Sequence, residues 1–170
     1  MKILSNADGR DWLARNCQIE EGPSLNKFFG HSVTYRIPAD SGRKTAIARA
    51  LREFVGNASE GLLWITGWGV WSSSENMSLF DGYRKSLGEH RSLREAPFHL
   101  FTGSNSVELE CLLDLTLYFF WDAILIHGSH TSAFRISHDE YIEIHTRDNA
   151  TLSSGTDVLE SAGLQRVPGL

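Results

Sequence analysis

Residues 107–145 read VELECLLDLTLYFFWDAILIHGSHTSAFRISHDEYIEIH and carry more hydrophobic side chain per residue than any other part of the chain. The first part of this stretch, Leu109–Phe120, is apolar on nearly every side, which is typical of a helix that is buried all round. Ala123–Ile126 is then a continuous apolar run of the length of a buried strand. We therefore expect a central helix and a central strand here, with the other elements organised around them.

The end of the same stretch predicts an antiparallel hairpin, because apolar and polar residues alternate on both sides of a polar loop at 138–140. A slip of one residue would turn every side chain to the other face, so only a loop of odd length pairs apolar with apolar residues. The three-residue loop sets Ile136 opposite Ile142. It also sets Arg135 opposite Glu143, and such opposite-charge pairs contribute roughly a few tenths of a kcal/mol. Loops of this length favour glycine at a left-handed position, and this loop contains none.

Helical and extended patterns alternate through the preceding part of the chain, which predicts helices packed on a sheet. The expected class is α+β or α/β: a single domain with a mixed sheet, helices packed on it and a C-terminal antiparallel hairpin. Residues 1–148 are expected to form this domain. Residues 149–170 are expected to be a peripheral segment, packed on the domain or frayed from it, with one short helix at 157–162. The other expected elements are strands at 31–37, 62–66 and 98–101 and helices at 42–55 and 77–87.

The composition is that of an ordinary globular protein, with 41% hydrophobic and 22% charged residues in a chain of 170. The net charge is −5, the pI is about 5.8, and lysine and arginine are scattered. Nucleic-acid binding needs a basic stripe that neutralises phosphates, so no nucleic-acid partner is expected. The longest apolar block, Cys111–Ile126, contains Asp114 and Asp122 and is shorter than the ~20 residues of a membrane helix. With no signal-like segment at the N-terminus, these features predict an acidic, soluble, cytoplasmic protein without a membrane partner.

Polar residues inside the apolar block have individual interpretations. Cys111 is expected to be a small core residue, which argues against a nucleophilic role, and a disulfide with Cys17 stays open. Asp114 is expected to lie with Glu110 on the exposed stripe of the helix. Asp122 stands at the junction of helix and strand and is expected to accept hydrogen bonds from backbone N–H groups, because a buried carboxylate needs partners.

Histidine and carboxylate residues near the hairpin form the first candidate site. His127, His130, Glu143 and His145 are metal-ligating residue types, and Glu143 and His145 share one face of a strand. Their spacing matches no specific zinc motif. The favoured interpretation is therefore that they are polar residues on the solvent side of the hairpin. We expect no cofactor and keep a metal ion as the lesser alternative.

Two glycine- and serine-rich loops that precede helices form the second candidate site. Glycine lets a ligand approach the backbone closely, and a tryptophan indole can stack on that ligand. Helix N-termini attract anions. If the sheet is parallel there, both loops lie at the same carboxyl edge, where open α/β sheets bind ligands. Ordinary turn and capping chemistry is the competing and favoured interpretation. The residues concerned are Gly67, Trp68, Gly69 and Trp71 in the first loop and Ser104 and Asn105 in the second.

Nucleophilic catalysis has weaker support than either of these sites. The chain contains no G-x-S-x-G turn of the kind that exposes a catalytic serine. A chain with seven histidines offers many combinations of serine, histidine and acid by chance. The catalytic combinations that the sequence allows contain Ser73 or Ser104 as nucleophile, His99 or His138 as base, and Asp139 as the acid.

These observations leave two hypotheses of different classes. The first is a non-catalytic domain that binds another protein, as an inhibitor or immunity-type antagonist. It is supported by the acidic balance, the absence of catalytic motifs and the solvent-facing carboxylates of the hairpin. The second is a small enzyme or ligand-binding domain that uses the loops at 67–74 and 103–106, with or without a metal at the histidines. The first is favoured because an enzyme usually leaves a stronger signature. No oligomeric state is predicted.

Overall fold

One antiparallel sheet runs through the structure. The structure is a computed structural model that describes residues 1–17, 25, 29–55, 60–68, 74–128 and 131–168. Residues 74–77 are described by their backbone alone. The strands are β1 (Lys2–Leu4), β2 (His31–Arg36), β3 (Gly61–Gly67), β4 (Phe98–Phe101), β5 (Asp122–Ile126), β6 (Ser132–Ser137), β7 (Tyr141–Thr146) and β8 (Gln165–Arg166). Their order in the sheet is β1-β4-β3-β5-β6-β7-β2-β8. Every pairing among these strands is antiparallel.

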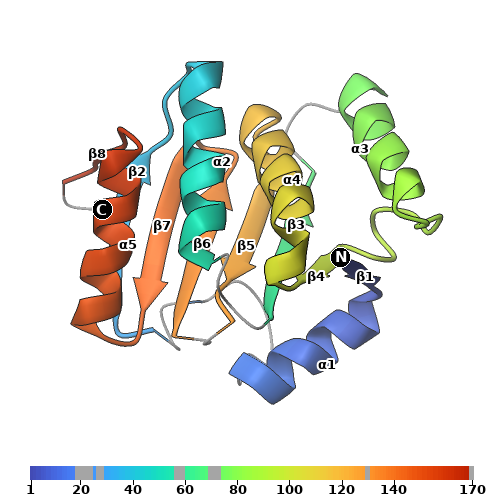
Figure 1. Cartoon of the computed structure of the whole chain (residues 1–170), viewed down its shortest axis with the longest axis horizontal. Helices are drawn as coiled ribbons and strands as arrows, with labels where there is room; N and C mark the ends of the chain where they lie inside the picture. Colours follow the sequence, from blue (N-terminus) through green and yellow to red (C-terminus); the bar gives the residue numbers. More distant parts are fainter. Residues whose placement is uncertain (18–24, 26–28, 56–59, 69–73, 129–130, 169–170) are drawn as a thin grey trace.

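Helices cover the two faces of this sheet unequally. Figure 1 shows α5, α2 and α4 side by side across one face, with α3 beyond α4 and α1 near β1 at the lower end. The short helical turn at Gly103–Asn105 leads directly into α4. The helices of the described residues are α1 (Asn6–Cys17), α2 (Ser41–Val55), α3 (Ser74–Ser86), α4 (Ser106–Tyr118) and α5 (Asn149–Ser161).

Alternating side chains of the strands build two separate cores, one on each face of the sheet. Successive residues of a strand point to opposite faces. In β5, Leu125 therefore belongs to the larger core, which also contains Leu113 of α4, whereas Ile124 belongs to the smaller core, which contains Trp12 of α1. The larger core lies under α2, α4 and α5, and the smaller core lies under α1. Part of the second face is left to polar residues.

The structure confirms the central helix and strand, together with the α+β class. In α4, Leu109, Leu112 and Leu117 are buried, and β5 lies in the interior of the sheet between β3 and β6. A mixed sheet was expected, whereas the described pairings are all antiparallel. This difference decides where the loops after β3 and β4 lie.

The hairpin has the predicted register. Ile136 pairs with Ile142 and Arg135 with Glu143 across β6 and β7. The loop lacks the glycine that its left-handed position favours, and Glu140 adopts that conformation instead, with φ of 66°. The carbonyl of Glu140 accepts a hydrogen bond of 2.7 Å from the backbone N–H of Ile37, which follows β2. The strained residue is thus held by the neighbouring strand.

The C-terminal segment is more regular than the sequence suggests. Helix α5 begins at Asn149 rather than near residue 157, and β8 adds a short strand beside β2. Asp148 caps the helix by accepting a hydrogen bond of 2.7 Å from the backbone N–H of Thr151. The helix packs on β7 through small side chains, and a β-carbon at Gly155 would overlap the side chain of Ile144. Because the buried face of α5 consists largely of such small residues, the hydrophobic pattern of the sequence does not reveal the full length of this helix.

The expectation of a buried Cys111 is wrong. Leu112 and Leu113 of α4 are buried, which turns Cys111 to the outer side, where it is exposed. Cys17 is buried and both thiols are free, so they form no disulfide. Burial raises the pKa of Cys17 to about 11. The pKa of Cys111 is also raised, first by partial desolvation and then by acidic neighbours that include Glu110. Neither thiol is activated as a nucleophile.

Replacing Glu140 by glycine should stabilise the protein. A β-carbon in the left-handed region costs about 1–2 kcal/mol, and glycine removes this cost. The change also removes an exposed Arg36–Glu140 ion pair of 3.5 Å, which contributes less than about 1 kcal/mol. We expect the free energy of unfolding in urea to be about 1 kcal/mol higher for Glu140→Gly than for Glu140→Ala. The alanine variant is the matched control, since it loses the same carboxylate and keeps the β-carbon. Equal stability of the two variants would show that the loop is not strained.

Candidate functional site

Part of the sheet face opposite α2, α4 and α5 presents polar and aromatic side chains. These side chains alternate along the strands with residues of the larger core, so they point to the face on which α1 packs. Each of them remains exposed or half-buried. We call this surface the open face; its residues are Thr34, Arg36, Trp64, Thr66, Asp122, Arg135, Ser137, Tyr141 and Glu143.

A pocket of about 430 Å³ lies on the open face next to α1. Four elements converge there: α1, β3, β5, and β6 with its hairpin loop. The floor is apolar and the walls carry charges of both signs. The residues that line it are Arg10, Trp64, Thr66, Asp122, Ile124, Arg135, Ser137, His138 and Asp139.

Asp122 and His138 form the most closely bonded pair of the pocket. The Asp122 carboxylate lies 2.8 Å from Nδ1 of the imidazole and accepts a second hydrogen bond, of 3.0 Å, from the backbone N–H of His138. The hydrogen bond with Asp122, then its charge and that of Asp139, raise the pKa of His138. The pairing follows from the sheet, because Ala123 lies opposite Ile136 and brings the start of β5 beside the end of β6.

Gly67 makes room for this pair. It lies opposite Asp122 across an irregularity in the β3–β5 pairing, and a β-carbon there would be 2.7 Å from Oδ2 of Asp122. The predicted glycine thus adjoins the Asp122–His138 pair, and the Asp122 side chain occupies the space that was expected for a ligand. The expected backbone hydrogen bond to Asp122 is confirmed.

A second charged group extends from the pocket across the open face. Arg135 Nη1 lies 3.5 Å from Oε2 of Glu143, and Nε2 of His145 lies 3.1 Å from the same oxygen. The hydrogen bond with His145, followed by the charge of Arg135, lowers the pKa of Glu143. At the far side the Arg36 guanidinium lies 6.0 Å from the centre of the Tyr141 ring. The open face therefore carries paired charges between aromatic side chains.

Helix α1 places Arg10 at the rim of the pocket. The neighbouring Gly9 is buried, and a β-carbon there would overlap the Phe98 ring, so the helix backbone rests directly on that ring. Phe98 in turn stacks on Trp64, with ring centres 4.9 Å apart. Arg10 is exposed and has no ion-pair or hydrogen-bond partner among the described residues. Its guanidinium is therefore available to a ligand at the pocket.

The described residues of the two predicted loops lie at opposite ends of the β3–β4 pair. Gly61 pairs with Phe101, so Ser104 and Asn105 follow β4 near the point where β3 begins, whereas Gly67 ends β3. Trp68 packs in the larger core, 5.0 Å from Phe80 and 5.3 Å from Trp121 between ring centres.

Ser104 and Asn105 serve the turn before α4. The Ser104 and Thr102 hydroxyls share a hydrogen bond of 2.8 Å, and Oδ1 of Asn105 accepts the backbone N–H of Thr102 at 3.3 Å. Gly69 and Trp71 lie outside the described residues. Among the described residues of the expected site, Gly67 and Trp68 are not brought together with Ser104 and Asn105, because antiparallel pairing separates strand ends that parallel pairing would bring together.

The predicted metal ligands that the structure describes, His127, Glu143 and His145, do not converge either. His127 packs on Phe54, which contacts Phe134 of the larger core, so it lies on the helix-covered face. Glu143 and His145 are together, as expected, but on the opposite face. His130 lies outside the described residues. Within the part of the chain that the structure describes, no three potential ligand side chains gather around one point.

The serine–histidine combinations are also separated in the structure. His99 is fully buried, and burial lowers its pKa to about 3. Ser104 is exposed beyond the end of β4, and Ser73 lies outside the described residues. His138 pairs closely with Asp122, whereas Asp139 is 3.5 Å from its Nε2. The Asp122–His138 pair had one signal in the sequence, namely that Asp122 interrupts the longest apolar block.

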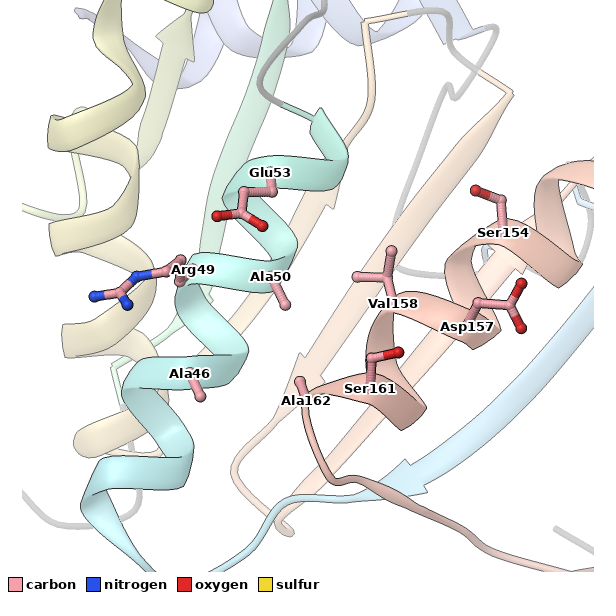
Figure 2. A pocket seen from close by; sticks show the side chains of 9 residues that line it. All are labelled: Ala46, Arg49, Ala50, Glu53, Ser154, Asp157, Val158, Ser161 and Ala162. Atoms are coloured by element: carbon pink, nitrogen blue, oxygen red, sulfur yellow. The ribbon is translucent and has the colours of Figure 1, made fainter.

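A larger groove of about 490 Å³ lies between α2 and α5 (Figure 2). Its inner side chains are small and include Ala46, Ala50 and Ala162. Figure 2 shows Arg49 directed away from the groove, toward α4, where Arg49 lies 3.4 Å from Glu110. The other polar side chains of its lining are Glu53, Ser154, Asp157 and Ser161, and none of them forms a closely bonded pair like Asp122 and His138 in the pocket of the open face.

Comparisons with protein-family models, with curated proteins and with solved structures find no match. Among the described helices, none combines the length and apolar character needed to cross a membrane.

The Asp122–His138 pair should give stability that depends on pH. The pKa of His138 is raised in the folded state, so the stabilisation is fully present below the unfolded pKa of about 6.5 and is lost as the pH rises through the folded value. We expect His138→Gln to reduce the free energy of unfolding by up to about 1 kcal/mol at pH 6, since the pair is partly exposed, and by less at pH 9. Urea denaturation at both pH values measures this difference. His90→Gln, at an exposed histidine, is the control. A loss that grows with pH would contradict the assignment.

Proposed function

We propose that this protein is a non-catalytic, cytoplasmic protein-binding domain, of the inhibitor or antagonist type, that docks a partner protein through the open face. The observation that carries the proposal is a sheet face with arginine, tyrosine and tryptophan side chains that remain partly exposed. These three residue types contribute most to binding energy at protein interfaces. In this structure they are Arg36, Tyr141, Arg135 and Trp64.

The arrangement of charges on the open face favours a specific partner over general adhesion. Arg135 with Glu143 and His138 with Asp122 are already paired and oriented in the unbound protein. Side chains held in this way lose little conformational entropy when they dock. Pairs of both signs also select a partner of complementary pattern, because like charges that meet at an interface cost several kcal/mol.

The alternative of a ligand-binding domain or small enzyme has one supporting observation, the Asp122–His138 pair in a pocket. A carboxylate that orients an imidazole is also the arrangement of a general base. Under this alternative, the ligand binds in the pocket on the open face and not at the loops at 67–74 and 103–106. The extended polar surface beyond the pocket, from Arg135 to Arg36, favours a macromolecular partner.

Affinity capture from extracts of the source cells, with a matched pair of double variants, tests the proposal. The test variant is Arg36→Glu with Tyr141→Ala, both on the open face and outside the pocket. The control is Lys85→Glu with Tyr118→Ala, which makes the same chemical changes at exposed positions of α3 and α4. We expect one protein to be captured by the wild type and the control and reduced at least about tenfold with the test variant.

Two checks make the result decisive. Circular dichroism and urea denaturation must show that both double variants are folded. A partner that the test variant retains and the control loses would transfer the binding site to the α3–α4 surface and overturn the proposal. A partner retained equally by both variants would do the same.

A further inference from the structure

The pocket beside Arg10 gathers cationic side chains from two parts of the fold, α1 and the β6 hairpin. Two arginines and one histidine of raised pKa face two carboxylates, those of Asp122 and Asp139. Asp122 is fully engaged by His138, at 2.8 Å from the ring and 3.0 Å from the backbone. Asp139 is mainly exposed and reaches the same imidazole only at 3.5 Å. Glu143, just beside the lining, offsets Arg135 at 3.5 Å, so Arg10 is the cationic group of the lining that no described carboxylate engages.

The two guanidinium groups of the pocket have N–H donors that no described acceptor uses. Arg10 has no partner among the described residues, and Arg135 meets Glu143 at 3.5 Å through one nitrogen. A guanidinium carries five N–H donors in a planar fork that matches the two oxygens of a carboxylate. Both arginines thus retain donors that a carboxylate ligand would satisfy.

The remaining lining suits a short carbon chain that ends in such a carboxylate. Trp64 provides an aromatic wall that is fixed by its stacking on Phe98, and Ile124 provides an apolar floor. Thr66 adds a hydroxyl at the exposed side. A phosphate would bring two negative charges toward Asp122 and Asp139, whereas a carboxylate brings one and meets less repulsion from them.

We propose that this pocket binds a carboxylate group, presented by an acidic side chain of the partner that docks on the open face. The inference rests on the proposed function for the source of the carboxylate, whereas the pocket chemistry stands on the residues themselves. Arg10 and Arg135 hold the carboxylate, and Trp64 packs against its methylene groups.

The first experiment is a titration of the isotope-labelled protein with N-acetyl-glutamic acid α-amide, followed by nuclear magnetic resonance. The matched neutral probe is N-acetyl-glutamine α-amide, which differs only at the terminal group. We expect the acid to shift the indole signal of Trp64 and the backbone signals of Arg10 and Arg135 in a saturable way, with Kd near roughly 1 mM. The amide should give no saturable shift. Equal binding of the two probes, or shifts confined to other parts of the protein, would overturn the proposal.

Arginine variants locate the interaction. Arg10→Gln and Arg135→Gln should each weaken binding of the acid at least about fivefold, because each removes charge-assisted hydrogen bonds. Arg15→Gln, at an exposed arginine of the same helix α1, is the control and should bind the acid like the wild type. Binding that survives in both pocket variants would place the acid elsewhere and contradict the proposal.

Combining this titration with the capture experiment separates the two proposals. The captured partner should be displaced by the acid probe and not by the amide probe. If the titration succeeds and no partner depends on the open face, the pocket takes its carboxylate from a free small acid, and both the proposed function and the stated source are overturned. If a partner depends on the open face and the acid does not bind, the pocket proposal alone is overturned.

Discussion

The antiparallel register of β5, β6 and β7 is the constraint on which the rest of the structure depends. Burial of Ile136 against Ile142 decides that Arg135 and Glu143 face the opposite side. A slip by one residue would drive these charges into the larger core, at a cost far above the energy of any single contact on the surface. The hydrophobic core thus determines which charged groups share the open face, although it makes no contact with a ligand there.

The same constraint explains where local strain is accepted. The three-residue loop that preserves the register leaves Glu140 in the left-handed region, which a non-glycine residue adopts only at a cost. The loop also brings His138 over the start of β5, where the Asp122 carboxylate accepts hydrogen bonds from the backbone N–H and the ring of His138. A cost of about 1–2 kcal/mol in the loop therefore accompanies the geometry that creates the pocket.

The two faces of the sheet have different roles. On one face, α2, α4 and α5 cover the larger core; on the other, α1 covers the smaller core and leaves the open face accessible. A rigid sheet with aromatic and arginine side chains and paired charges is well prepared for docking, because few side chains must be ordered when a partner arrives. This separation of a stabilising face from an interacting face underlies both the proposed function and the proposed carboxylate pocket.

The sequence by itself determined the elements with a dense or strictly alternating apolar pattern, namely α4, β5 and the hairpin. It also determined the hairpin register, because only one pairing keeps apolar residues opposite apolar residues. It did not determine that β3 and β4 are antiparallel, so Gly67 and Ser104 were expected at one edge and lie at opposite ends. The contact of Asp122 with His138 and the position of Arg10 were decided only by the tertiary structure. The physical reason is that periodicity records which face of an element is buried, whereas strand order and helix docking depend on contacts between residues far apart in the chain.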